Sequence, residues 1–120
     1  MEEMRLGLVE ARFADLIWQY EPIASGDLVR LCEQQLGWKK STTYTVLKKL
    51  CDRGIFKNEQ SIVTSCLTKE EFHARQSERF VEETFEGSLP AFIAAFSSRK
   101  KPTPAELEEI RALLDKFGEG

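Results

Sequence analysis

The 120-residue sequence predicts a mainly α-helical fold that contains one short β-hairpin. Apolar residues recur at helical spacing through most of the chain, which is the primary signal of amphipathic helices. Glycine or proline stands where these patterns stop. One pair of β-branched or aromatic runs flanks a polar turn, which indicates a hairpin. The chain is 42% hydrophobic, so it can bury a core, and its length suits one domain or a small domain with an appendage.

The first two helices are predicted by their starts and stops. Apolar residues between positions 9 and 18 share one helical face, and Pro22 ends this helix because the residue before a proline avoids the α region. Ser25 is a good N-cap for the second helix. The apolar stripe of that helix runs from Leu28 to Leu36, and Gly37 is its expected stop.

The third helix is predicted to begin near residues 40–42 and to end at Gly54. Its inward face is expected to consist of Thr43, Val46, Leu47 and Leu50. The runs 55–56 and 62–64 then flank a polar turn at residues 58–61, so they predict a hairpin. Three helices followed by a short β-hairpin is the order of a winged helix-turn-helix, which we expect to occupy residues 1–68 as a DNA-binding domain.

The remaining residues, 69–120, are predicted to form further helices. A strongly charged helix begins at Lys69 and is broken at Gly87-Ser88, and a dense amphipathic stripe follows it. Thr103, Pro104 and Glu106 combine an N-cap, an N1 proline and an N3 glutamate, which is a capping box for a final helix.

These C-terminal helices carry much apolar surface but are too thin to enclose a core, so we expect them to pair with a second copy of the chain. DNA-binding proteins of this architecture are usually dimeric. The expected dimerisation residues are Phe80, Phe85, Leu89, Phe92, Ile93, Phe96, Leu107, Ile110 and Leu114.

The third predicted helix is basic, although the whole chain has a formal charge of −3. Slim threonines with lysines beside them suit a helix that enters the major groove and neutralises phosphates. We therefore predict that this helix reads DNA. The expected DNA-binding residues are Lys39, Lys40, Ser41, Thr42, Tyr44, Thr45, Lys48 and Lys49.

The expected contacts differ within this set. Tyr44 and Thr45 would meet base edges or a thymine methyl group, Thr42 would lie near the backbone, and the four lysines would contact phosphates. Alternatively, Tyr44 packs against Trp38 and only the lysines contact DNA. A different class of function, a winged-helix protein–protein adaptor without specific DNA binding, is favoured by an acidic residue at the hairpin turn, Glu59.

Several other classes of function are not expected. Apolar runs are too short to span a bilayer, so the protein is expected to be cytoplasmic, without membrane insertion. Cys32, Cys51 and Cys66 lack metal-ligand spacing, so we expect them to be core residues and predict no metal. The single histidine, His73, has no recognisable catalytic partner, and neither an enzyme nor a cofactor is predicted.

Three strings, together with Trp18, carry a resemblance to a known family. The first is Trp38-x-x-Ser41-Thr42-x-x-Thr45-x-Leu47-x-x-Leu50-x-x-x-Gly54. The second is Gly87-Ser88-Leu89-x-Ala91-x-x-Ala94-Ala95-Phe96, and the third runs from Glu106 to Leu114. These strings resemble the bacterial penicillinase-repressor family (the BlaI/MecI type), and the likeness covers nearly the whole chain.

The resemblance implies a homodimeric transcriptional repressor whose N-terminal winged helix binds a double-stranded, palindromic DNA operator. In that family a membrane β-lactam sensor-protease triggers cleavage within the C-terminal region, which releases the DNA. The matching peptide bond here is Ala95-Phe96, although the family's usual pair has asparagine before the phenylalanine. A short wing with Glu59 also departs from the family pattern.

Overall fold

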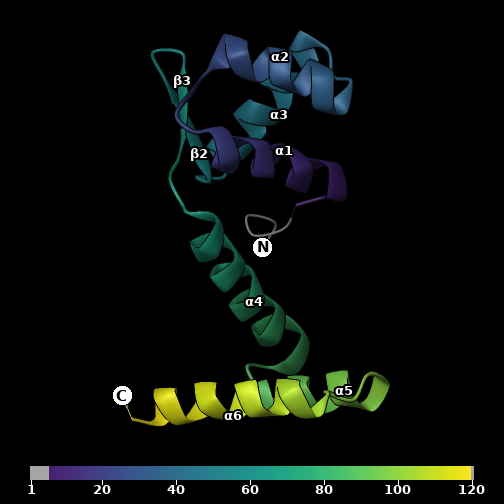
Figure 1. Ribbon diagram of the computed structural model, residues 1–120. Coiled ribbons are helices and arrows are strands. Elements are labelled where there is room, and N and C mark those ends of the chain that lie inside the picture. Colours follow the sequence, from purple (N-terminus) through teal and green to yellow (C-terminus); the bar gives the residue numbers. More distant parts are fainter. Residues whose placement is uncertain (1–5, 120) are drawn as a thin grey trace. The chain divides into compact units, whose positions relative to one another are not determined.

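The computed structural model describes residues 6–119 and contains six helices and three short strands in that range (Figure 1). In chain order these elements are α1 (Leu8–Tyr20), β1 (Ile23–Ala24), α2 (Ser25–Leu36), α3 (Lys40–Asp52), β2 (Phe56–Glu59), β3 (Ile62–Ser65), α4 (Lys69–Phe85), α5 (Leu89–Arg99) and α6 (Pro104–Gly118). The fold is mainly helical, as the sequence predicts, and the order of its elements is that of a winged helix followed by C-terminal helices.

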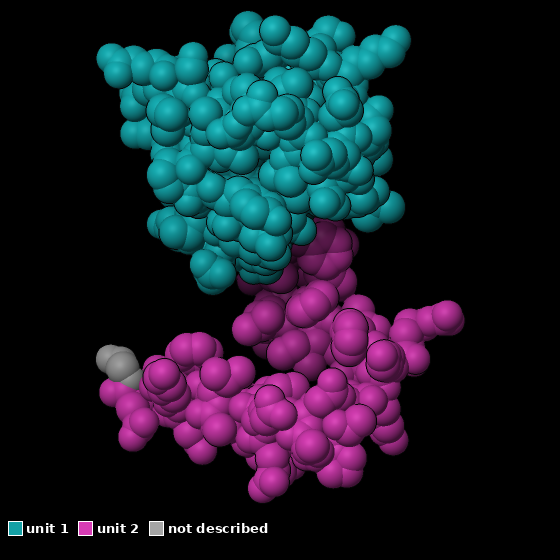
Figure 2. Space-filling model, turned by 45° about the horizontal axis from the view of Figure 1, so that its top comes forward, with its two compact units in different colours: residues 1–79 teal, residues 80–120 magenta. Residues whose placement is uncertain are grey.

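The chain forms two compact units, residues 1–79 and residues 80–120 (Figure 2). Helix α4 runs from the first unit into the second. The division expected after residue 68 lies at the start of this helix, whereas the two units divide inside it.

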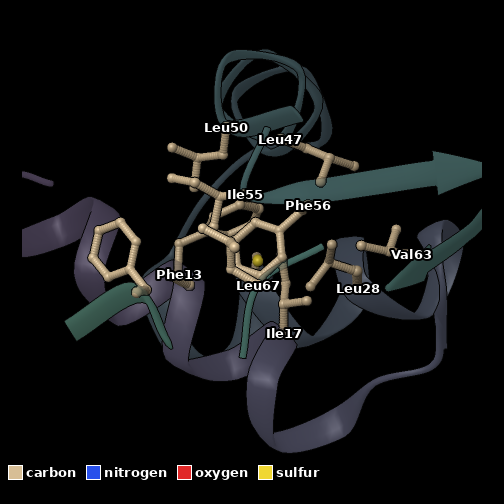
Figure 3. Packing of buried hydrophobic residues seen from close by; sticks show 12 residues of the cluster. Phe13, Ile17, Leu28, Leu47, Leu50, Ile55, Phe56, Val63 and Leu67 are labelled. Carbon is tan, nitrogen blue, oxygen red and sulfur yellow. The ribbon is translucent and has the colours of Figure 1, made fainter. Parts of the chain in front are cut away.

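The N-terminal unit has one hydrophobic core, to which α1, α2, α3 and the hairpin all contribute (Figure 3). Phe13 and Ile17 of α1 are fully buried, as are Leu28 of α2 and Leu50 of α3. Trp18 borders this core and donates its indole N–H to the Leu67 carbonyl at 2.9 Å. The inward face predicted for α3 is confirmed, because Thr43, Leu47 and Leu50 are buried and Val46 packs against the core.

A three-stranded antiparallel sheet completes this unit, in the order β1-β3-β2. Strand β1 was not expected from the sequence; its two residues pair with Val63 and Ile62. The hairpin turn is also tighter than predicted, because Asn58 and Glu59 belong to β2 and only Gln60 and Ser61 form the turn. Both turn residues have positive φ, the sign pattern of the type I′ turn that suits a two-residue hairpin.

Glycines end the two helices that flank the helix-turn-helix connection, as predicted. Gly37 follows α2 with φ 69°, a left-handed conformation that costs glycine nothing because it has no Cβ. Trp38 then stacks on Phe13 at a ring-centroid distance of 5.3 Å. Gly54, with φ 80°, lets the Ile55 amide donate back to the Leu50 carbonyl, which closes the end of α3.

Two sequence predictions in this unit are wrong. Ser25 is not the N-cap of α2: Ala24, held extended by its pairing with Ile62, is the cap, and Ser25 is the first helical residue. The cysteines do not all lie in the core either. Cys32 is buried and Cys51 is partly buried, but Cys66 is exposed because it follows β3 at the surface.

The C-terminal helices begin where their capping residues predict. The Thr103 hydroxyl accepts from the Glu106 amide at 3.1 Å, and the Glu106 carboxylate accepts from the Thr103 amide at 2.9 Å. The hydrogen bond from the Thr103 amide, and after it the one from the Thr103 side chain, lower the pKa of the Glu106 carboxyl group. Thr68 and Glu71 form the same reciprocal pair at the start of α4, and their spacing is the same sequence signal of a capping box.

Candidate nucleic-acid interface

Helix α3 presents one solvent-exposed face that combines hydroxyl and basic side chains. Ser41, Thr45 and Lys48 recur at i, i+4 and i+7, and Thr42 and Lys49 flank them on the same side. All five side chains are exposed. Since the opposite face of α3 is buried in the core, this exposed face is fixed in orientation relative to the N-terminal unit.

The amino-terminal end of α3 is the most positive part of this face. Lys39 is the N-cap residue and makes no side-chain capping hydrogen bond, so no cap side chain accepts from the first amides of the helix. Lys39 and Lys40 are both exposed, and neither forms an ion pair within the described range 6–119. Free helix-terminal amides beside two cations suit a phosphate group.

The two lysines at the other end of α3 are engaged in ion pairs. Lys48 Nζ lies 3.0 Å from an Asp52 carboxylate oxygen, and Lys49 Nζ lies 2.8 Å from Glu10 Oε2. Two hydrogen bonds lower the pKa of the Glu10 carboxyl group. The bond from Lys49 has the larger effect and the bond from the Gly7 amide the next largest. Of the four lysines predicted as phosphate contacts, Lys48 and Lys49 are therefore ion-paired, whereas Lys39 and Lys40 have no ion-pair partner among residues 6–119.

Tyr44 occupies the edge of the exposed face and is partly buried. Its ring packs against the core, and its hydroxyl donates to Ser25 Oγ at 3.1 Å. The Ser25 amide in turn donates to the Ser61 carbonyl in the hairpin turn at 2.8 Å. Tyr44 thus connects α3 to the start of α2 and, through Ser25, to the hairpin. The sequence could not show this contact, since it joins residues on different elements.

Replacing Tyr44 with phenylalanine tests whether its hydroxyl reads DNA. We expect Tyr44→Phe to keep the wild-type sequence preference, because the hydroxyl already has a partner inside the fold. The free energy of unfolding should fall by about 0.5–1.5 kcal/mol for the lost hydrogen bond. A binding-site selection and a denaturant titration measure the two effects. A changed base preference without a loss of stability would instead assign the hydroxyl to a base edge.

The hairpin brings little positive charge to this surface. Lys57 Nζ lies 3.4 Å from Glu59 Oε1, and both side chains are exposed. The acidic residue predicted at the turn therefore lies at the end of β2, where it offsets the one lysine of the hairpin. The wing is short, with four residues in each strand.

A second surface in the C-terminal unit is apolar. The rings of Phe80, Phe85 and Phe92 pack on one another, with centroids 5.7–5.9 Å apart. Other apolar side chains of α5 and α6 remain largely exposed, including Phe96 at 52% and Leu114 at 54%. Of the predicted dimerisation residues, the exposed ones are Phe80, Leu89, Ile93, Phe96, Leu107, Ile110 and Leu114. Leu113 and Phe117 of α6 are exposed too.

The candidate cleavage bond lies inside a helix. Ala95 and Phe96 both belong to α5, and both are exposed. The Ala95 carbonyl accepts a hydrogen bond from the Ser98 hydroxyl at 2.8 Å, and the Phe96 carbonyl accepts one from the Lys100 amide at 3.0 Å. A protease needs extended backbone, so the end of α5 must unwind before this bond can be cut.

Two further features are absent from residues 6–119. None of the helices there is long and apolar enough to cross a membrane. Within the same range, no group of three or more His, Cys, Asp or Glu side chains could hold a metal ion.

Known proteins share sequence similarity with this chain over most of its length. The family model described as "Penicillinase repressor" matches residues 6–116. The chain is 21% identical over 111 residues to the methicillin resistance regulatory protein MecI of Staphylococcus aureus (strain Mu50 / ATCC 700699), which covers 89% of this chain and 90% of the relative. Proteins of the same description from Mammaliicoccus sciuri and Staphylococcus epidermidis are each 20% identical over 106 residues, with 85% of this chain and 86% of each relative covered.

Proposed function

Because the chain belongs to the penicillinase repressor family, we propose that it represses transcription by binding a palindromic DNA operator as a homodimer. The family is one of transcriptional repressors and not of enzymes. The observation that carries the proposal is the exposed face of α3. Its hydroxyl-bearing residues are bordered by Lys39 and Lys40, which form no ion pair within residues 6–119. Its relatives' description as methicillin resistance regulators is consistent with a regulatory role.

On this proposal, α3 enters the major groove with its amino-terminal end foremost. The Lys39 and Lys40 ammonium groups and the first amides of α3 would bind phosphates, which positions the helix. Thr45, in the middle of the exposed face, would contact base edges or a thymine methyl group. The hydroxyl groups of Ser41 and Thr42 would donate hydrogen bonds to the DNA backbone. Tyr44 is partly buried and its hydroxyl donates to Ser25, so it would contribute through its ring and not through the hydroxyl.

Dimerisation is supported by the apolar surface of the C-terminal unit. Apolar side chains exposed along two consecutive helices are costly in water, and a second copy of the same surface would cover them. A two-fold dimer would place two α3 helices in successive major grooves, about 34 Å apart along the duplex. The palindrome of the operator would match this symmetry.

Derepression by proteolysis is the regulatory part of the proposal. A cut between Ala95 and Phe96 would separate α6 and the end of α5 from the rest of the chain, and with them most of the exposed apolar side chains. The dimer would then weaken and leave the operator. The resemblance implies a membrane sensor-protease as the trigger. Mass measurement after incubation with such a protease would locate the cut; an intact chain would exclude this mode of release.

The proposal is tested by binding of the protein to DNA from its own promoter region. We expect one specific complex whose affinity falls roughly 10³–10⁵-fold between 50 and 200 mM salt, as counterions return to about 6–10 phosphates per dimer. A gel-shift titration at several salt concentrations measures this. Affinity that is insensitive to salt, or equal for unrelated DNA, would contradict the repressor and favour the adaptor, to which the Lys57–Glu59 pair in the wing gives some support.

A further inference from the structure

Glu10 holds one of the cations on the exposed face of α3. Its Oε2 atom lies 2.8 Å from Lys49 Nζ, while its Oε1 atom accepts the Gly7 amide at 3.0 Å. The glutamate is therefore fixed at both oxygens. Its side chain is 20% exposed, compared with 51% for Lys49, so the carboxylate is the more anchored partner and draws the lysine towards α1.

Lys49 would otherwise belong to the proposed DNA-binding face. Thr42, Thr45 and Lys49 recur at i, i+3 and i+7, which places them along one side of α3. A phosphate near this stripe must compete with Glu10 for the ammonium group. The exposed ion pair is weak in itself, but it cancels a charge that would release a counterion on binding DNA.

We propose that the Glu10 carboxylate competes with DNA phosphates for the ammonium group of Lys49. By neutralising Lys49, Glu10 lowers the affinity of the repressor for DNA. This inference rests on the proposed function and adds a residue of α1 to the determinants of DNA binding. It also separates Lys49 from Lys39 and Lys40, which have no such competitor among the described residues.

The test is a gain of affinity, which a damaged fold cannot mimic. Glu10→Gln keeps the size of the side chain and an oxygen for the Gly7 amide but removes the charge. It should bind operator DNA on the order of tenfold more tightly, and its salt dependence should steepen by about 1.8 for the two protomers of a dimer. Glu10→Ala, which removes the acceptor altogether, should give a gain of the same sign.

Two matched variants isolate the lysine. Glu33→Gln removes the same charge from an exposed site on α2 without releasing Lys49, so it should show at most a small gain. Glu10→Gln combined with Lys49→Ala should return the affinity and the salt slope to those of Lys49→Ala alone. Thermal melting checks that the variants are folded to the same extent.

The outcomes separate this inference from the proposed function. Specific wild-type binding with no gain in Glu10→Gln beyond that of Glu33→Gln would overturn the role of Glu10 alone. Weaker binding by folded Glu10→Gln would also overturn it, because the ion pair would then be orienting α3. Absence of wild-type binding would overturn the repressor proposal, and the Glu10 inference with it.

Discussion

Replacing Lys39 and Lys40 together by alanine should reduce affinity for the operator by about 10²–10³-fold at moderate salt. Both lysines stand at the amino-terminal end of α3, are exposed, and form no ion pair among residues 6–119. On the proposed geometry each would neutralise a phosphate in both protomers. Loss of four contacts should lower the salt dependence of binding by about 3.6, since each phosphate contributes roughly 0.9 to the slope.

The matched control is Lys100→Ala combined with Lys101→Ala. It removes the same charge from an exposed loop of the C-terminal unit, so it reports the effect of net charge alone. Fluorescence anisotropy across a salt series, with specific and unrelated DNA, gives the affinity and the slope of each variant. Equal losses in the two double variants would contradict phosphate binding at the amino-terminal end of α3. A loss confined to the operator would assign Lys39 or Lys40 to base edges instead.

The positions of the helices could be predicted because their signals are local. Gly37 and Gly54 end their helices with positive φ, and Thr103 with Glu106 starts α6, so each boundary is decided by residues within one turn of it. Strand β1 has no comparable local signal. Its two residues are extended because they pair with β3, which lies much later in the chain.

The chemistry of the exposed face of α3 was less predictable than its position. The helical spacing identified which side chains point outward, and the structure agrees for Thr45 and Lys48. The helical spacing could not show that Lys49 forms an ion pair with Glu10, or that the Tyr44 hydroxyl donates a hydrogen bond to Ser25. Both contacts join helices that the periodicity treats separately, so they follow from tertiary packing alone.

Replacing Leu114 with aspartate should convert the proposed dimer into a monomer at micromolar concentration. Leu114 lies on α6 and is 54% exposed, so the carboxylate can remain in water in the single chain and the helix should still form. In a dimer it would be buried against the apolar surface of the second copy, at a cost of several kcal/mol for an unpaired charge. A monomer holds only one half-site, so operator affinity should fall by about 10³-fold. Sedimentation velocity and the gel-shift measure the two effects.

Ala112→Asp provides the control for this variant, because Ala112 is exposed on the same helix but lies on the side opposite Ile110, Leu114 and Phe117. It adds the same charge and the same poor helix former, so it should remain dimeric and bind the operator. If both variants stay dimeric, the interface lies elsewhere in the chain. If Leu114→Asp is monomeric yet keeps full operator affinity, one copy suffices for binding. That result would contradict recognition of a palindrome by a dimer, but it would not contradict the proposed DNA contacts of α3. Only joint loss of the dimer and of operator binding, confined to Leu114→Asp, connects the apolar surface of α6 to repression.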